Sequence, residues 1–133
     1  MSERSFEVVL GLIGAGNVAV GLLALLAPHT FFEGIGTYGV ENSHYIGDAG
    51  AFIAAYGFAV LVAIRQPAWR VPVLALGAIW YGLHAVNHAF DTGQARSEAR
   101  GWADTISIAL IGVLLAYLAN AARRLRGRDG APG

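Results

Sequence analysis

The chain has 133 residues, of which 56% are hydrophobic and 14% are charged, and it contains no cysteine. A soluble domain typically has roughly 25% charged residues, so these charges are too few to cover a water-facing surface. The lack of cysteine excludes disulfides, thiolate nucleophiles and cysteine-based metal or iron–sulfur sites. The net charge is zero, which does not suit a nucleic-acid binder. The composition therefore predicts a single integral membrane domain over residues 1–133.

Four segments are long and apolar enough to cross the roughly 30 Å hydrocarbon core of a bilayer. The predicted spans are residues 6–27, 44–64, 71–90 and 102–122. Pro28 ends the first span, and Pro72 lies in the first turn of the third, where its missing N–H is tolerated. The first segment is longer than the apolar core of a signal peptide, so we expect it to remain as a span. The predicted fold is all-α, a four-span transmembrane helical bundle.

The basic residues are all arginine and are divided unevenly between the two sides of this bundle. Only Arg96 and Arg100 lie on the side of the connection between the third and fourth spans. The other side, which carries both termini, holds Arg4, Arg65, Arg70, Arg123, Arg124, Arg126 and Arg128. Because arginine-rich loops stay in the cytoplasm, we expect both termini to be cytoplasmic.

The third span is amphipathic. Plotted at 100° per residue, one arc of about 120° holds its polar side chains. They are Tyr81, His84, Asn87, His88 and Asp91. The opposite arc is apolar and contains Ile79, Leu83, Val86 and Phe90. Because polar side chains are costly in hydrocarbon, the polar arc should face other helices or a wet cavity.

Other polar side chains lie at the outer ends of the remaining spans. Asp48 and His84 lie at similar estimated depths, so we expect them to pair across the bundle. Below Asp48, small residues at Ala51, Ala55 and Ala59 should let helices approach closely. The predicted extracytoplasmic pocket consists of Asn17, Glu41, His44, Asp48, Trp80, Tyr81, His84, Asn87, His88, Asp91 and Asp104.

Several chemistries fit this pocket. His84 and His88 have an i, i+4 spacing that metal sites use, and nearby carboxylates suit Zn, Cu(II) or Fe. The metal ligands would be His44, Asp48, His84, His88 and Asp91. A haem between two histidines, a pocket for a small organic ligand, quinone or proton, and a hydrogen-bond cluster that only fixes packing remain open. No nucleophile–base triad, phosphate loop or nucleotide fingerprint assigns a catalytic residue.

The segment HYIGDAGAFIAAYGFAVLVA, followed by LHAVNHAFD, resembles small uncharacterised four-helix membrane proteins of high-GC bacteria, loosely the DoxX-like group. The resemblance covers the second and third predicted spans. It implies the bacterial cytoplasmic membrane and a role as a subunit or accessory of a membrane redox system. It assigns no role to any residue.

The sequence thus predicts a small multi-pass membrane protein whose outer His/Asp pocket binds a metal ion or small ligand, with a redox link. The alternative is a non-catalytic accessory or interaction subunit whose polar cluster only sets helix packing. A transporter protomer would need oligomerisation, because four short helices enclose little space. The expected partners are the lipid bilayer and a homo-oligomer or larger membrane complex, with no nucleic acid.

Overall fold

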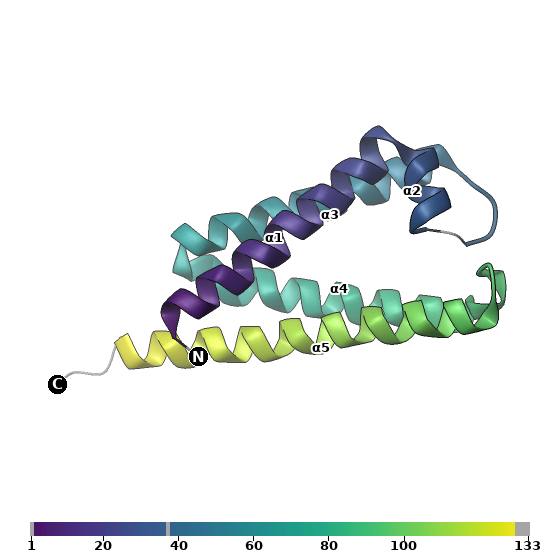
Figure 1. Ribbon diagram of the computed structural model, residues 1–133. Coiled ribbons are helices and arrows are strands. Elements are labelled where there is room, and N and C mark those ends of the chain that lie inside the picture. The colour runs from purple at the N-terminus through teal and green to yellow at the C-terminus, as the bar shows by residue number, and fades with distance from the viewer. Residues whose placement is uncertain (1, 37, 130–133) are drawn as a thin grey trace.

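The computed structural model describes residues 2–36 and 38–129, and this part of the chain is helical almost throughout. Four long helices run back and forth beside one another (Figure 1). They are α1 (Glu3–Leu26), α3 (Ser43–Arg65), α4 (Arg70–Phe90) and α5 (Glu98–Asp129). The short elements between them are α2 (Pro28–Gly34) and the 3₁₀ turns η1 (Pro67–Trp69) and η2 (Thr92–Gln94).

The all-α class is confirmed, and the predicted spans coincide with the four long helices. Within residues 2–36 and 38–129, three helices are long and apolar enough to cross a membrane: α1, α3 and α5. The fourth helix, α4, is not among them, because Trp80, Tyr81, His84, Asn87 and His88 make one side of it polar or amphipathic. The four-span count is therefore not confirmed by helix length and apolarity alone.

Local sequence signals explain where the helices start. The hydroxyl of Ser2 accepts a hydrogen bond from the backbone N–H of Ser5, and the side chain of Asn42 does the same for Tyr45 at the start of α3. Pro28 ends α1 as predicted and also begins α2, so the connection expected after the first span is partly helical.

Helices α1 and α3 pack so closely that the glycines between them, Gly14, Gly21, Gly50 and Gly57, leave no room for a side chain. A Cβ atom on Gly57 would lie 2.6 Å from the Val18 backbone nitrogen, and one on Gly50 would lie 2.7 Å from that of Leu25. The predicted close-packing residues Ala51 and Ala55 are exposed instead. The prediction is wrong for these two residues, because the glycine face allows a closer backbone approach than the alanine face. The third predicted residue, Ala59, is partly buried against the core.

We predict that Gly21→Ala destabilises the protein by about 1–3 kcal/mol, the usual cost of overpacking. The new methyl group would lie less than 3.0 Å from backbone atoms of Gly50 and Ala54, which cannot rotate away. The matched control is Gly16→Ala, whose methyl group would meet nothing within 4 Å. Because alanine favours helix over glycine, the control should be neutral or stabilising by up to about 1 kcal/mol. Equal unfolding free energies for the two variants in detergent would contradict the close approach.

All four long helices share one buried core, and it lies toward the end of the molecule where α1 begins and α5 ends. We call this the termini end, and the opposite end, with α2 and η2, the loop end (Figure 1). The core residues come from the halves of the helices nearest the termini end. They are Phe6, Leu10, Tyr56, Val60, Ala63, Val73, Leu74, Leu115, Leu118, Ala119 and Ala122.

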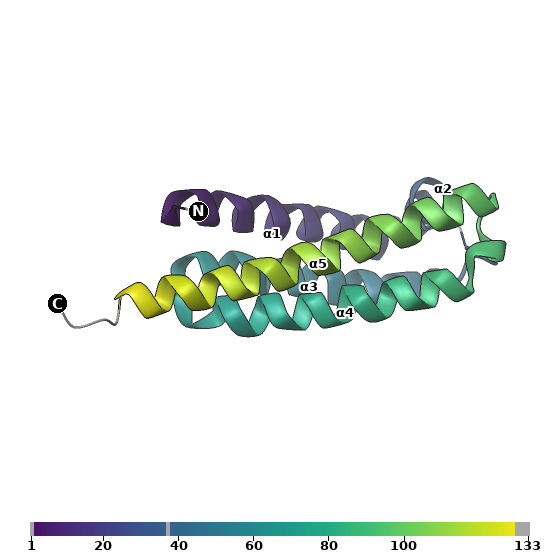
Figure 2. The same cartoon turned by 90° about the horizontal axis from the view of Figure 1, so that it is seen from below.

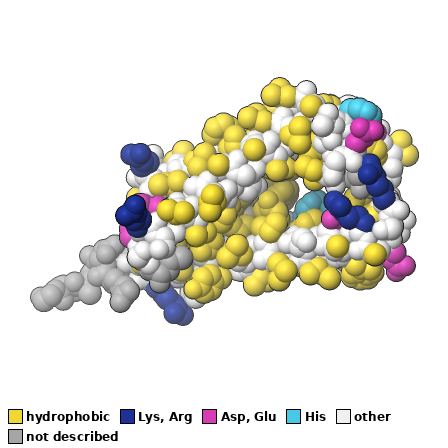
Figure 3. Space-filling model, viewed as in Figure 1, with side chains coloured by type: hydrophobic (Ala, Val, Ile, Leu, Met, Phe, Trp, Pro, Cys, Tyr) yellow, Lys and Arg dark blue, Asp and Glu magenta, His cyan; other side chains and the backbone are white. Residues whose placement is uncertain are grey.

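Away from this core, the molecule divides into two helical hairpins, α1 with α3 and α4 with α5. The hairpins meet at the termini end and diverge toward the loop end (Figures 1 and 2). The space-filling view shows the molecule hollowed between them, with a histidine side chain inside (Figure 3). We call this space the wedge. Its shape follows from the position of the core, since the large buried side chains all lie at one end.

The outer surface of the bundle is apolar, as a bilayer requires. On α4, the predicted lipid-facing residues are exposed: Ile79 by 62%, Leu83 by 67%, Val86 by 54% and Phe90 by 85%. The polar arc of the same helix is half-buried at Tyr81, His84 and His88. The predicted amphipathic division of α4 is therefore confirmed, and its apolar side is suited to lipid.

A buried arginine holds the termini end together. Arg70, the first residue of α4, is only 4% exposed. Its Nε donates to the carbonyl oxygen of Ala63 at 3.1 Å, and its guanidinium pairs with the carboxylates of Glu3 and Glu7. It also lies over the ring of Phe6, 5.3 Å from the centroid. One side chain thus links α1, α3 and α4.

We predict that Arg70→Ala destabilises the protein by about 1–3 kcal/mol, below the 3–5 kcal/mol typical of a fully buried pair, because both glutamates are half-exposed to solvent. The variant also leaves a carbonyl at the end of α3 without its donor. Arg65→Ala removes an exposed arginine from the same end and is the control. Unfolding in detergent measures both, and equal stability of the two variants would show that Arg70 is not a structural link.

Candidate functional site

A ladder of rings follows one side of α4 from its middle to its loop end. The rings of Trp80 and His84 are stacked nearly parallel, with centroids 5.5 Å apart and planes 5° apart. The next ring, His88, meets His84 edge-on at 4.5 Å. Helical spacing places His84 and His88 on the side of α4 that buries Val73 and Gly77 in the core. Nearer the loop end this side therefore lines the wedge.

The inner limit of the wedge is a hydrogen bond between the two hairpins. The Tyr81 hydroxyl donates to Oδ1 of Asn17 at 2.9 Å, while Nδ2 of Asn17 donates to the Ile13 carbonyl in its own helix. Phe52 of α3 packs against Trp80, with ring centroids 5.1 Å apart. Aromatic rings and one amide thus form the floor of the wedge.

The connection between α2 and α3 reaches across to the other hairpin at the loop end. Tyr38 forms a β-bridge with Ala95, and its ring meets His88 edge-on at 4.4 Å. Gly39 has a φ of 60°, a left-handed backbone conformation that favours glycine. The N–H of Gly39 donates to the Gln94 carbonyl at 3.2 Å. We call residues 38–39 with their partners the strap. It roofs the wedge.

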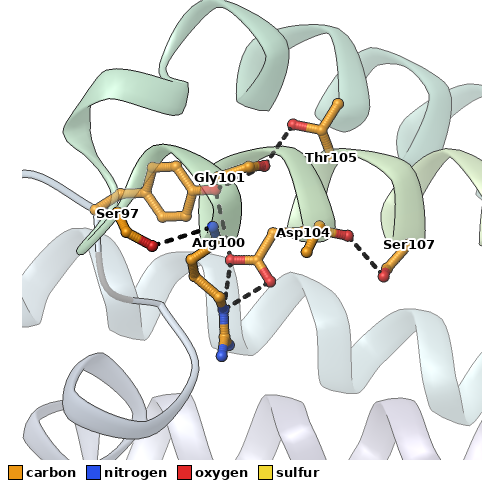
Figure 4. A network of polar contacts seen from close by, with 8 residues as sticks. Ser97, Arg100, Gly101, Asp104, Thr105 and Ser107 are labelled. Atoms are coloured by element: carbon orange, nitrogen blue, oxygen red, sulfur yellow. Dashed lines mark hydrogen bonds and ion pairs between the residues drawn. The ribbon is translucent and has the colours of Figure 1, made fainter.

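The strap is anchored on the first turns of α5. The Tyr38 hydroxyl lies 3.4 Å from the Gly101 carbonyl and 3.5 Å from the Asp104 carboxylate. Arg100 Nε donates to both oxygens of that carboxylate, at 2.9 and 3.0 Å (Figure 4). Burial and the nearby Asp104 charge raise the pKa of Tyr38, so its hydroxyl is a donor at neutral pH.

The structure brings only some of the predicted pocket residues together. Asn17, Trp80, Tyr81, His84, His88 and Asp104 lie around the wedge, through the contacts described above. Asn87 and Asp91 bond to each other at the end of α4, where Asp91 also accepts from Gln94 at 2.8 Å.

The residues predicted at the start of the second span lie apart from this group. His44 and Asp48 form an exposed i, i+4 pair at 3.6 Å, and Glu41 pairs with His29. The predicted Asp48–His84 pair is not formed. The two helices diverge toward the loop end, so equal depth does not bring them into contact (Figure 1). Within the described residues, no three His, Asp or Glu side chains group as a metal site would require.

Two buried side-chain atoms in the described part of the chain have no hydrogen-bond partner: His88 Nδ1 and the Tyr56 hydroxyl. His88 Nδ1 belongs to the ladder. The Tyr56 hydroxyl lies deeper, against Gly77 of α4, inside the core rather than in the wedge. Because buried polar atoms are nearly always paired, both atoms are exceptions within the described residues.

The sequence analysis does not place Tyr38 in the pocket, and it does not predict that His29 pairs with Glu41. The available signal for Tyr38 was its position between Gly36 and Gly39, since a large ring between two glycines in a connection often marks a tight turn. The His29–Glu41 pair depends on α2, which the sequence analysis did not predict.

We predict that the His29–Glu41 pair stabilises the loop end most between about pH 4.5 and 6.5. The hydrogen bond to Glu41 raises the pKa of His29 above 6.5, so this stabilisation is lost as pH rises through the folded value. The same bond lowers the pKa of Glu41 below 4.5, so stabilisation is also lost in stronger acid. The Tm difference between the wild type and Glu41→Gln should be largest near pH 5.5 and vanish near pH 9. A constant difference would contradict the pairing.

Comparison with known proteins gives one family. The domain of unknown function DUF4345 matches residues 5–90. The chain belongs to the DUF4345 family. No curated protein and no solved structure matches it. The match agrees with the expected uncharacterised family but gives no link to DoxX-like proteins.

The DUF4345 match runs from α1 to the end of α4. It therefore includes Asn17, the strap residue Tyr38 and the whole ring ladder. Asp104 and Arg100, which anchor the strap, lie beyond it on α5. The family region thus holds the floor and one wall of the wedge, while α5 supplies the second helix of the other hairpin.

Proposed function

We propose that this DUF4345 protein is a small multi-pass membrane protein that binds an organic ligand in the wedge. The observation that carries the proposal is the ring ladder of α4. At the termini end, the corresponding side of α4 is packed in the core. Toward the loop end, the same side of α4 carries Trp80, His84 and His88. The two hairpins are separated in front of these rings (Figure 3).

The ladder suits ligand binding better than packing alone. A cluster that only fixed helix packing would be expected to pair its polar atoms across the helices, as Asn17 and Tyr81 do. His84 and His88 instead contact other rings, and Nδ1 of His88 has no partner in the described residues. Aromatic side chains with a few polar atoms are the usual lining of small-molecule sites.

The proposal includes four crossings of a bacterial cytoplasmic membrane, with both termini in the cytoplasm. With 21 residues, α4 has the roughly 30 Å length that a crossing needs. It packs along α5, and its outer side exposes the large apolar side chains Ile79, Leu83, Val86 and Phe90. The arginine asymmetry supports the orientation, since Arg96 and Arg100 are the only arginines at the loop end among the described residues.

We predict opposite signals from topology reporters placed after Gly133 and within residues 91–97. A phosphatase reporter should be active only in the second position, and a cytoplasmic fluorescent reporter only in the first. A third fusion, at Ala68 in η1, should behave like the one after Gly133. Matching signals at all three positions would contradict both the fourth crossing and the orientation.

The binding role is tested by identifying the small molecules that co-purify with the protein. We expect protein purified in mild detergent to carry a near-stoichiometric small organic molecule, detected by native mass spectrometry and solvent extraction. Trp80→Leu and His84→Ala should each reduce its occupancy at least fivefold. Trp69→Leu, which changes an exposed tryptophan at the termini end, is the control. Equal occupancy in all four proteins, or no bound molecule in any, would contradict the proposal.

The alternative role, as an accessory subunit, is favoured by a different surface. A shallow apolar groove of about 460 Å³ runs between α4 and α5 and is lined largely by small residues, among them Gly82, Ala85 and Gly112. Small residues let a further membrane helix approach closely. A protein that carries no bound molecule but purifies as a homo-oligomer or with a partner would favour this alternative.

A further inference from the structure

The exposed arginines at the termini end form a surface that the binding role of the wedge does not use. They come from three helices and are Arg4 of α1, Arg65 of α3, and Arg123, Arg124 and Arg126 of α5. We propose that this arginine surface binds the phosphate headgroups of anionic phospholipids. The proposal does not depend on the wedge or on its ligand. Its support comes from the pairing of charges at the termini end, the depth of the arginines, and the contrast with the loop end.

The acidic side chains that could neutralise the arginine surface already have a partner. The carboxylates of Glu3 and Glu7, at the start of α1, pair with the guanidinium of Arg70. Arg70 is buried, so its charge is used inside the protein and not by a headgroup. Among the described side chains, the exposed arginines are therefore left without a carboxylate partner. The described surface at this end has a net positive charge.

The arginines lie at the depth where a bilayer has its headgroups. On α3, Arg65 directly follows the apolar run of the helix, and on α5, Arg123 directly follows the core residue Ala122. Two exposed aromatic side chains, Trp69 in η1 and Tyr117 of α5, lie toward the same end. Tryptophan and tyrosine favour the headgroup region of a membrane. Guanidinium groups just beyond such residues are placed to contact lipid phosphates.

The arginine surface extends around the end of the molecule and does not form one compact patch. Its basic side chains are spread over this end in the space-filling view (Figure 3). On α5, Arg124 and Arg126 point about 160° apart, because successive residues turn by about 100°. A lipid leaflet surrounds a membrane protein in the same way, whereas an acidic protein would be matched by a single basic face. The distribution therefore favours lipid as the partner.

The loop end has the opposite charge and serves as an internal comparison. Both of its arginines are bonded within the protein, Arg96 to the Glu33 carbonyl and Arg100 to the Asp104 carboxylate. Among the described residues, its carboxylates outnumber them and are Glu33, Glu41, Asp48, Asp91, Glu98 and Asp104. An anionic headgroup would be repelled there. Preference for anionic lipid should thus depend on arginines of the termini end alone.

Lipid titration of the purified full-length protein in a neutral maltoside detergent tests the proposal. Native mass spectrometry should show dioleoylphosphatidylglycerol binding at least tenfold more tightly than dioleoylphosphatidylcholine, because basic side chains attract anionic headgroups. The two lipids have the same chains, and only the first has a net charge. Raising the salt concentration about tenfold should remove most of the preference, since salt screens charges at an exposed surface.

Substitutions locate the binding surface. The triple variant Arg65→Gln/Arg123→Gln/Arg124→Gln should lose the preference for phosphatidylglycerol. The same three positions changed to lysine keep the charge, so this variant should bind phosphatidylglycerol within about threefold of the wild type. Arg96→Gln removes an exposed arginine from the loop end and should leave the preference unchanged. Equal Tm values in detergent would show that all these variants are folded.

Equal binding of the two lipids by the wild type, or a preference that survives the glutamine triple variant, would overturn the proposal. Inorganic phosphate separates the two sources of the anion. If it raises the Tm without lipid as much as phosphatidylglycerol does, the surface binds a soluble anion and the lipid assignment is wrong. A co-purified molecule that is lost in Trp80→Leu belongs to the wedge, so the two proposals fail or stand separately.

Discussion

The architecture depends on where the two hairpins are joined, and the strongest joint is the buried guanidinium of Arg70. It contacts carboxylates from the start of α1 and a carbonyl at the end of α3, while its own backbone begins α4. A fork-shaped cation can serve several acceptors at once, which a lysine ammonium does less well. Because this joint and the shared core lie at the termini end, the helices have no comparable reason to converge at the other end.

Each hairpin is stabilised by contacts between its own helices. The wedge can therefore exist without weaker packing inside either hairpin. The α1–α3 hairpin is held by glycines that bring backbones together, and Gly101 brings α5 equally close to Thr92. Dispersion contacts of this kind are the main source of helix association in lipid. The hairpins can therefore separate at the loop end while each remains well packed. The strap then limits the separation, through backbone bonds that need no apolar burial.

The helices and the two faces of α4 could be predicted from the sequence, because they depend on periodicity along a single helix. The four helices, the exposed apolar side of α4 and the inward direction of Tyr81 and His84 all follow from residue spacing. Pairings between helices could not be predicted in the same way. Depth alone suggested Asp48 with His84, but depth does not give the angle between hairpins, and Asp48 pairs within its own helix. Arg70 contributes to the predicted topology only, since nothing in its neighbours along the chain shows that Glu3 lies beside it.

The contrast between the two halves of α4 is the most informative feature for function. Val73 near the start of α4 and His88 near its end lie on the same face of the helix, but the side chains along this face differ in chemistry. The half that meets α1, α3 and α5 is apolar, as a packed core in lipid requires. The half in front of the wedge changes to indole and imidazole rings, which contact one another as well as Phe52 and Tyr38. The ligand-binding role proposed above rests on this change of chemistry along one face of α4.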